Sequence, residues 1–408
     1  MDTSYIYYAY GIRDFECTKT EYKGNTIIHH IQKRDVKTRC ECCHSHVVVR
    51  NGFKIRKIRS VNIGTKQSIL HVKVRRLKCK TCGADVYEDL HFVTGKQRYT
   101  HRLARLVIEL LHRMTIKDVA HYLGLSWDTV KDIHKNYLNH KFSHIDIKDV
   151  KHIGIDEFAL RKGHVYLTIV VDMLSGAIIH VGDGKGIDSL KKFWPKLKRS
   201  GAKIESVSSD MSAAFISAIK KNLPDAIHVF DHFHVQKLAG EALDKVRREV
   251  YNQEKDLEKR KVIKGTRWLL LRHDKDIFTE DEKKRLDNVI KMNEPLSKAY
   301  ILNEYLQEVW KQDSYKEGEA VLDDWIKQAR ESKVPTIEKL GNSIAAYRTG
   351  ILAYYKCRTS NAKVEGINNK IKVLKRNAYG YRDIDYFKLR LFNLHNDKIT
   401  RFGLTRYI

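Results

Sequence analysis

The sequence predicts an α/β protein in which a mixed β-sheet with flanking helices follows a β-rich metal-binding segment and a pair of short helices. Three observations support this. Two Cys-x-x-Cys motifs flank hairpin-like stretches before residue 95, helical spacing of apolar residues begins near Thr100, and β-branched runs alternate with helices from residue 150. A charged, strand-poor stretch, residues 235–357, interrupts this last pattern and predicts an all-helical insertion.

Composition limits the classes of protein that this chain can belong to. Its 408 residues suffice for two to four domains, and 42% hydrophobic residues with only four prolines indicate a folded chain. The 77 lysines and arginines against 50 acids give a net charge of +27, which favours a polyanion such as nucleic acid. No apolar run is long enough to span a membrane, and the N-terminus lacks a secretory signal. We therefore expect a reducing compartment, where clustered cysteines more often bind metal than form disulfides.

Two pairs of cysteines have the spacing of zinc ligands. The first lies in Cys40–Cys43, which reads Cys-Glu-Cys-Cys, and the second in Cys79–Cys82. Two such knuckles bring four thiolates together, which suits a closed tetrahedral Zn²⁺ site. With hairpin-like stretches at Val47–Ile58 and Ile69–Leu77, this is the layout of a structural zinc ribbon, the alternative being unrelated buried cysteines. The predicted ligands are Cys40, Cys43, Cys79 and Cys82, although Cys42 could replace Cys40 and His44 or His46 could take part.

A helical pair follows the zinc ribbon. Ile116–Tyr122 predicts a short helix that reaches Gly124, and Ser126 can cap a second helix from Trp127 to about Tyr137. This is the helix-turn-helix pattern, whose second helix enters the major groove of DNA. An ordinary helical hairpin is the alternative, but the basic charge and the neighbouring zinc ribbon favour DNA binding. The predicted DNA contacts are Trp127, Thr129, Lys131 and Lys135.

Three apolar runs, Ile153–Leu160, Val165–Leu174 and Ala177–Val181, predict the first three strands of the sheet. Asp156 lies inside the first run, where an isolated buried carboxylate costs on the order of several kcal/mol unless it is paired, neutral or bound to a cation. An outward-facing Asp156 on a half-exposed strand is the alternative. Glu157 is expected on the opposite face, because successive side chains of a strand alternate.

Further acids follow the later strands. The stretch Lys203–Ser209 predicts a fourth strand that ends on Asp210, and Ile227–Phe230 predicts a fifth that ends on Asp231 and is followed by His234. Between the third and fifth strands we expect a helix at Gly186–Arg199, interrupted at Pro195, and another at Met211–Leu223. The helical insertion then has apolar anchors at Trp268, Leu269, Trp310, Leu322, Trp325 and Ile326.

A helix that begins near Ser360 has two distinct faces. Its apolar face is Val364, Ile367, Ile371 and Leu374, and its polar face is Glu365, Asn368, Asn369 and Lys372. For a lone glutamate a solvated helix face is the alternative. In a mixed sheet the first and fourth strands can be neighbours, so this helix could cover Asp156 and Asp210. Three clustered carboxylates repel one another unless cations lie between them, and oxygen ligands select Mg²⁺ or Mn²⁺.

The segments GIDEF, SSDMSAAF, FDHFHV and SNAKVEGINNKIKVLKRNAYGYR, in this order, resemble bacterial insertion-sequence transposases of the ISL type. Those enzymes combine a zinc ribbon, a helix-turn-helix and an RNase H-like DDE core. The resemblance spans nearly the whole chain and is strongest at Val150–His234 and Ser360–Phe392. It implies Asp156, Asp210 and Glu365 as the acid triad, with Asp231 and His234 as a D-x-x-H element. One departure is that the family's first knuckle usually reads C-P-x-C-G, whereas Cys43 here precedes His44.

The resemblance implies an enzyme that binds the terminal repeats of its element, cleaves by metal-assisted phosphodiester hydrolysis and transfers the 3′ ends to target DNA. Two Mg²⁺ or Mn²⁺ ions would be held by Asp156, Asp210 and Glu365. His234 would touch the scissile phosphate, unless it is a core histidine. We expect a homodimer or higher oligomer in the synaptic complex, no membrane partner, and a bacterial cytoplasmic location at the nucleoid.

Two other functions share these features. One is a sequence-specific DNA-binding regulator that keeps the fold without catalysis, and the other is a structure-selective RNase H-like nuclease. The presence of all three acids argues against the regulator, and a nuclease would cut branched DNA whatever its terminal sequence. The predicted segments are 1–95 zinc ribbon, 96–148 helix-turn-helix, 149–234 first part of the catalytic core, 235–357 helical insertion and 358–408 final core helices.

Overall fold

The chain forms two compact units, Met1–His144 with Arg376–Ile408 and Ile145–Lys375. A computed structural model describes residues 5–34, 39–161, 165–272, 279–357, 362–378 and 380–395, without the side chains of Ala362, Lys363 and Glu365. No helix in the described part of the chain combines the length and the apolar character that a membrane span needs. The predicted α/β class with mixed sheets and a helical insertion is confirmed.

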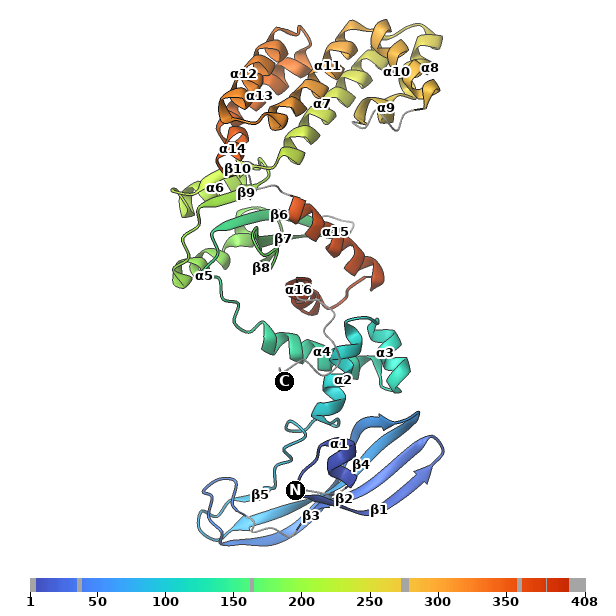
Figure 1. Cartoon of the computed structure of the whole chain (residues 1–408), viewed down its shortest axis with the longest axis vertical. Helices are drawn as coiled ribbons and strands as arrows, with labels where there is room; N and C mark the ends of the chain where they lie inside the picture. The colour runs from blue at the N-terminus through green and yellow to red at the C-terminus, as the bar shows by residue number, and fades with distance from the viewer. Residues whose placement is uncertain are drawn as a thin grey trace. The chain divides into compact units, whose positions relative to one another are not determined.

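The first unit begins with a β-sheet whose strand order is β1-β2-β4-β3, with β5 added to β4 (Figure 1). Strands β1 and β2 pair antiparallel, as do β3 and β4, whereas β2 and β4 are parallel. Alternate side chains of β4 pack with a short N-terminal helix, α1, into an apolar core. These elements are α1 (Tyr5–Tyr10), β1 (Phe15–Lys23), β2 (Thr26–Lys33), β3 (Val48–Ile63), β4 (Lys66–Cys79) and β5 (Asp85–Tyr87).

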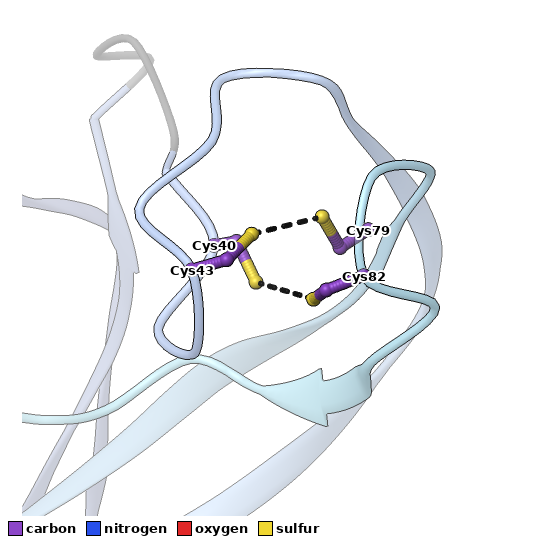
Figure 2. A group of neighbouring side chains, drawn as sticks. All are labelled: Cys40, Cys43, Cys79 and Cys82. Atoms are coloured by element: carbon purple, nitrogen blue, oxygen red, sulfur yellow. Dashed lines mark hydrogen bonds between the residues drawn. The ribbon is translucent and has the colours of Figure 1, made fainter.

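Both cysteine knuckles lie at one end of the β3–β4 hairpin and bring four sulfur atoms together (Figure 2). The Sγ atoms of Cys40 and Cys82 are 3.7 Å apart, and those of Cys43 and Cys79 are 3.6 Å apart. All four lie within 4.8 Å of one another. In a tetrahedron with Zn–S bonds of about 2.3 Å, sulfur atoms are about 3.8 Å apart, so this arrangement fits Zn²⁺.

The residue after the second cysteine of each knuckle has a left-handed backbone. Gly83 has φ 73° and His44 has φ 58°. Glycine adopts this conformation without strain, whereas histidine does so less readily but more often than most residues. The departure at His44 therefore preserves the turn at a small conformational cost. Cys42 is exposed and lies outside the sulfur group, although its backbone N–H is 3.4 Å from the Sγ of Cys40.

The helices that follow form the predicted helix-turn-helix. Thr115 and Asp118 make a capping box at the start of α3, and Gly124 ends that helix with φ 64°. The Ser126 side chain then caps α4 by accepting from the backbone N–H of Thr129. A third helix precedes them, and their apolar faces share one core. The helices of this region are α2 (His101–Leu111), α3 (Ile116–Leu123) and α4 (Trp127–Lys141), with α16 (Ile384–Asn393) from the end of the chain.

The second unit contains a five-stranded sheet of order β10-β9-β6-β7-β8 (Figure 1). Strands β6, β9 and β10 are parallel, and β7 is antiparallel to both its neighbours. The first and fourth predicted strands are therefore central neighbours, as expected. The elements are β6 (His152–Arg161), β7 (Val165–Asp172), β8 (Ile178–Asp183), η1 (Ile187–Leu190), α5 (Phe193–Ser200), β9 (Ser206–Ser209), α6 (Ala213–Asn222) and β10 (Ile227–Phe230).

Two details of this unit differ from expectation. Pro195 does not interrupt a helix. It lies in the first turn of α5, where its missing N–H would be unpaired anyway, and the break falls earlier, between η1 and α5. Trp268 is not a buried anchor, because its side chain is 68% exposed, whereas Trp325 is fully buried.

The predicted insertion is helical throughout its described residues and packs around one large apolar core. This helical body is joined to the sheet at β10. A Cβ at Gly350 would lie 2.4 Å from the ring of Phe230, so α13 approaches the strand end closely. The helices are α7 (His232–Gln253), α8 (Leu257–Lys264), α9 (Arg267–Leu271), α10 (Glu280–Met292), α11 (Glu294–Tyr305), η3 (Leu306–Lys311), α12 (Tyr315–Glu331), α13 (Pro335–Leu352) and α14 (Tyr354–Cys357). Helix α15 (Ala362–Asn377) follows the insertion.

The sulfur group makes a testable prediction about zinc. The purified protein should contain close to one zinc per chain, and Cys79→Ser with Cys82→Ser should remove it and destabilise the N-terminal sheet, because metal binding contributes to folding. Metal analysis and thermal unfolding measure both effects. Cys42→Ser, which removes a thiol outside the group, should retain the zinc. A freshly purified wild-type protein without zinc would contradict this.

Candidate active site

The register of the parallel strands brings Asp156 and Asp210 to the same level of the sheet. Gly154 on β6 pairs with Ser208 on β9. Two residues further along each chain are Asp156, still within β6, and Asp210, just beyond the end of β9. The two carboxylates therefore belong to neighbouring chain segments at the same edge of the sheet, as the sequence predicted.

Asp231 occupies the equivalent position after the next strand. Ser209 pairs with Phe230, and the backbone N–H of Asp231 donates to the carbonyl of Ser209. Asp231 is 8% exposed and caps α7, accepting from the backbone N–H of Phe233. Its second carboxylate oxygen lies 2.9 Å from Nδ1 of His234. Asp231 thus fixes the orientation of His234 beside the other two acids.

The acids around His234 affect its protonation. The hydrogen bond to Asp231 raises the pKa of His234 more than burial lowers it, and the negative charges of Asp156 and Asp210 raise it further. A histidine with a raised pKa is more often protonated near neutral pH. His234 is therefore half-buried and suited to carry a positive charge near an anionic group.

Helix α15 covers the face of β6 that carries Asp156. A Cβ added to Gly154 would lie 2.7 Å from Sδ of Met173 and 2.9 Å from Cγ2 of Val364, so only a glycine leaves room for this close approach. One turn along the helix, Nδ2 of Asn368 donates to Oδ2 of Asp156. The apolar face predicted for this helix is confirmed, since all four of its residues are buried: Val364, Ile367, Ile371 and Leu374.

Asp156 does not face outward on this strand. Burial raises the pKa of Asp156, although the hydrogen bonds from Asn368 and from the backbone N–H of Glu157 oppose the rise. The nearby Asp231 adds to it and His234 reduces it. The site therefore holds a carboxylate that is costly to ionise unless a positive charge is added.

Two observations fit a divalent cation at this position. The donors near Asp156 and Asp210 are hard oxygen atoms, which Mg²⁺ and Mn²⁺ prefer. The Oδ1 atom of Asn368 is buried and has no hydrogen-bond partner among the described residues, so one more oxygen beside Asp156 is left for a ligand. Glu365 lies on α15, three residues before Asn368, but its side chain lies outside the described residues. Within the described ranges, only the four cysteines bring three or more Cys, His, Asp or Glu ligand atoms within 4.8 Å of one another.

Glu157 has a role that the sequence did not reveal. Its Oε1 accepts a hydrogen bond of 2.8 Å from the backbone N–H of Gly186, which has φ 83°. Burial raises the pKa of Glu157, and the negative charge of Asp210 adds to this. Ile153 and Ile155 pack against η1, α5 and α6, so Glu157 is on their face of β6, opposite Asp156. It holds the loop between β8 and η1.

The residues predicted to contact DNA lie on α4, but two of them have a protein partner. The Nζ atoms of Lys131 and Lys135 lie 2.8 and 2.9 Å from Oδ2 of Asp383, the residue that caps α16. Burial opposes ionisation of Asp383, but hydrogen bonds from Lys131, the Tyr386 backbone and Lys135 outweigh it and hold the pKa of Asp383 well below its usual range. DNA would have to compete with this carboxylate for both lysines.

The other two residues are differently placed. Trp127 is 49% exposed, with Nζ of Lys131 5.5 Å from its ring centroid, and Thr129 is half-buried at the start of α4, close to the Ser126 hydroxyl. On the buried side of α4, Nδ1 of His134 lies 2.7 Å from the Tyr386 hydroxyl. The contact between α4 and α16 joins positions about 250 apart, and the only local signal was that Asp383 can cap a helix.

The raised pKa of Asp156 makes a testable prediction about pH and stability. In the unfolded chain Asp156 has its ordinary pKa of about 3.9, whereas in the folded protein its pKa is raised. The folded protein therefore loses stability as the pH rises above about 3.9, and the loss is complete above the raised pKa. In buffer without Mg²⁺ or Mn²⁺ at pH 7, which leaves the zinc of the cysteine group in place, Asp156→Asn should therefore unfold at a higher temperature than wild type. The difference should shrink as the pH falls, because wild-type Asp156 then becomes protonated in both states. Asp188→Asn, at an exposed position, controls for the lost charge, and an equal gain at every pH would contradict this explanation.

Three family models match segments of this chain. A family model described as Transposase, of the ISL3 DDE type, matches residues 153–391. The helix-turn-helix domain of transposase family ISL3 matches 88–138, and the zinc finger of the IS204/IS1001/IS1096/IS1165 transposases matches 37–82. The helix-turn-helix and zinc-ribbon predictions are thereby confirmed.

Two relatives of this chain are transposases of insertion sequences. The transposase for insertion sequence element IS1001 from Bordetella parapertussis is 33% identical over 386 residues, 94% of each chain. The transposase for IS1557 from Mycobacterium tuberculosis is 28% identical over 88% of this chain and 86% of its own. A chain of the Drosophila P element transposase strand transfer complex has a TM-score of 0.41 at 11% identity, covering 75% of this chain and 95% of that one, a likeness too weak to carry an argument.

The transposase model matches more than half of the chain, and the Bordetella relative is similar along nearly all of it. This chain therefore belongs to the ISL3 family of transposases, with the helix-turn-helix and zinc-ribbon domains of that family in its N-terminal part.

Proposed function

We propose that this transposase binds the terminal repeats of its insertion sequence, cleaves a phosphodiester bond there and transfers the resulting 3′ ends to target DNA. The observation that carries the proposal is the pairing of β6 with β9, which brings Asp156 level with Asp210 beneath α15. Family membership supports the DNA substrate. The same membership supports a homodimer or larger synaptic complex and work in the bacterial cytoplasm at the nucleoid.

Asp156, Asp210 and Glu365 form the acid triad in this proposal. They would hold Mg²⁺ or Mn²⁺, which when bound neutralises phosphate charge and activates a nucleophile in phosphoryl transfer. Asn368 orients the Asp156 carboxylate through its amide and offers a buried oxygen on the same side. Because α15 is held against β6 at Gly154, Glu365 and Asn368 come to the sheet on one helix.

His234 is the proposed contact to the scissile phosphate. Asp231 accepts from its Nδ1, which orients the ring and favours the protonated form. A cationic imidazole attracts an anionic phosphate oxygen and can donate to it. Asp231 acts through His234 and is a positioning residue.

The acid triad is tested by substitutions that keep shape and remove one charge. Asp156→Asn, Asp210→Asn and Glu365→Gln should each lower cleavage of element-end DNA by on the order of 10³-fold or more, and double variants should lose little beyond that, as expected for groups that act as a unit. Binding to the same DNA should survive. If Glu365→Gln cleaves normally, the third acid of the triad is another residue, for example Glu338 or another acid of the insertion.

Glu157→Gln is the matched control for these variants. It removes a carboxylate one residue from Asp156, yet the amide oxygen of glutamine can still accept from the Gly186 N–H. Cleavage should therefore be almost unchanged. If Glu157→Gln abolishes cleavage and Asp156→Asn does not, the roles of the two acids are reversed. Wild-type protein that binds but never nicks in Mg²⁺ would indicate a regulator, and equal cleavage of branched DNA lacking the repeats would indicate a nuclease.

The helix-turn-helix gives a separate prediction. Lys131→Ala with Lys135→Ala should weaken binding to element ends and reduce the salt slope by about one unit for each phosphate that is no longer neutralised. Asp383→Asn should do the opposite and strengthen binding, because it removes the carboxylate that competes for both lysines. Fluorescence anisotropy at several salt concentrations measures both. Unchanged affinity and slope in the double lysine variant would exclude this face of α4 from the DNA interface.

A further inference from the structure

The β3–β4 hairpin carries a strong local excess of positive charge. From Cys42 to Ala84 the chain has eleven lysines and arginines and not one aspartate or glutamate. Two of these cations are matched by acids from the next segment, since Arg75 pairs with buried Glu88 and Arg76 with Asp85. In the described part of the chain, Lys54, Lys57 and Lys73 have no acidic partner. A cluster of unmatched cations on one hairpin favours an anionic ligand.

The same part of the hairpin also exposes large apolar side chains. Phe53 is 58% exposed, Ile55 50% and Val49 39%, and Tyr87 on the adjoining strand β5 is 40% exposed. Further along β3, at Ile58, the strand becomes buried beneath the apolar core. In the half of the hairpin next to the cysteines, the edge strand β3 thus exposes side chains on both faces, whereas Val72 and Val74 of its partner β4 are buried. This exposed edge of the sheet is called the outer ribbon: Val49–Lys57 of β3, Lys73 of β4 and Tyr87 of β5.

Cations and aromatic rings are paired on each face of the outer ribbon. Nζ of Lys73 lies 4.7 Å from the ring centroid of Phe53, and Nζ of Lys54 lies 3.6 Å from that of Tyr87. Phe53 and Lys54 are consecutive, so the two pairs point to opposite faces. Surfaces that contact the backbone and the bases of nucleic acids often combine aromatic side chains with lysines.

Helix α4, the second helix of the helix-turn-helix, is less basic than the outer ribbon. Its exposed side includes Asp128 and Asp132, and its lysines Lys131 and Lys135 are engaged by Asp383. A protein of net charge +27 that binds DNA needs cations free to meet phosphates, and more of them lie on the outer ribbon than on α4.

We propose that the outer ribbon is a second DNA-binding surface, separate from the helix-turn-helix. The strands at the edge of a β-sheet can lie in a groove of duplex DNA, where Lys54, Lys57 and Lys73 would meet phosphates and Phe53 and Tyr87 would contact sugars or base edges. The inference rests on the proposed function in that it takes the DNA to be the element end. Charge decides the occupant, because a second copy of this basic chain would bring cations against cations.

The test compares pairs of residues that match in chemistry. Phe53→Ala with Lys73→Ala, and Tyr87→Ala with Lys54→Ala, each remove one exposed aromatic ring and one lysine. Tyr22→Ala with Lys66→Ala is the control, since Tyr22 is 69% exposed and Lys66 lies 5.8 Å from its ring centroid, away from the outer ribbon on the same sheet. All are made in the full chain, and zinc content is measured to show that the knuckles remain folded. Binding to element-end duplex is followed by fluorescence anisotropy at several salt concentrations.

Each outer-ribbon variant should bind about tenfold more weakly than wild type and show a smaller salt slope by about one unit, whereas the control should change affinity less than twofold. An equal loss in the control would mean that only overall charge matters and would overturn the proposal. Unchanged DNA binding with a change in oligomeric state would also overturn it, by assigning the surface to a second copy. Wild-type binding and cleavage are measured alongside. If wild type binds and cleaves the DNA and the variants bind it equally well, the outer ribbon is excluded as a DNA-binding surface and the proposed function stands. A wild-type protein that neither binds nor cleaves the DNA would refute the proposed function itself.

Discussion

Partial burial of the Asp156 carboxylate is the constraint around which the second unit is arranged. A carboxylate on a central strand loses much of its hydration, and its neighbours Asp210 and Asp231 are also acids. Asn368, the Glu157 backbone N–H and His234 oppose the penalty without removing it, since the pKa of Asp156 stays raised. A divalent cation would relieve what remains. Ionised Asp156 is thus unfavourable on its own, and the cation proposed for the site would offset this cost.

The burial of Asp156 helps to explain where the long helical insertion begins and how it is anchored to the sheet. It begins with α7, whose N-terminus is capped by Asp231, and its α13 packs closely on Phe230 at the end of β10. The insertion therefore starts at the acidic edge of the sheet and is anchored there. Its large core gives it stability of its own, and the chain leaves it to form α15, which lies over β6 at Gly154. A separation of 155 positions between Asp210 and Glu365 is compatible with one site for this reason.

Charge is distributed unevenly in the first unit. Acids from the end of the chain and from α4 itself accompany the lysines of α4. On the outer ribbon, Lys54, Lys57 and Lys73 have no acidic partner among the described residues, and the rings of Phe53 and Tyr87 are exposed. Two surfaces with different chemistry would let one read DNA sequence and the other contribute affinity, because base contacts specify and phosphate contacts position. Zinc held by Cys40, Cys43, Cys79 and Cys82 would fix the base of the ribbon, since both knuckles lie at the end of β3 and β4.

The sequence by itself determined the features that depend on local chemistry. Local sequence is enough to indicate the knuckle spacing, the caps at Ser126 and Gly124, the strand runs and the apolar face of α15, and the structure has all of them. It also suggested Asp156 and Asp210, because acids at strand ends and inside an apolar run are conspicuous, whereas His234 was suggested by the resemblance to the transposase family. The assignment of Asp156, Asp210, Glu365 and His234 to the site and the five-segment division of the chain stay predictions.

Only the tertiary structure decided which distant groups meet. No local pattern joins Asp383 to Lys131, or Asn368 to Asp156, because each contact depends on the packing of elements more than 200 residues apart. The exposure of Trp268 and the bond from Gly186 to Glu157 were equally hidden, since burial and hydrogen bonding depend on neighbours that the chain brings in from elsewhere. Periodicity reveals which face of a helix or strand is apolar, but the three-dimensional fold alone selects the partner that covers it.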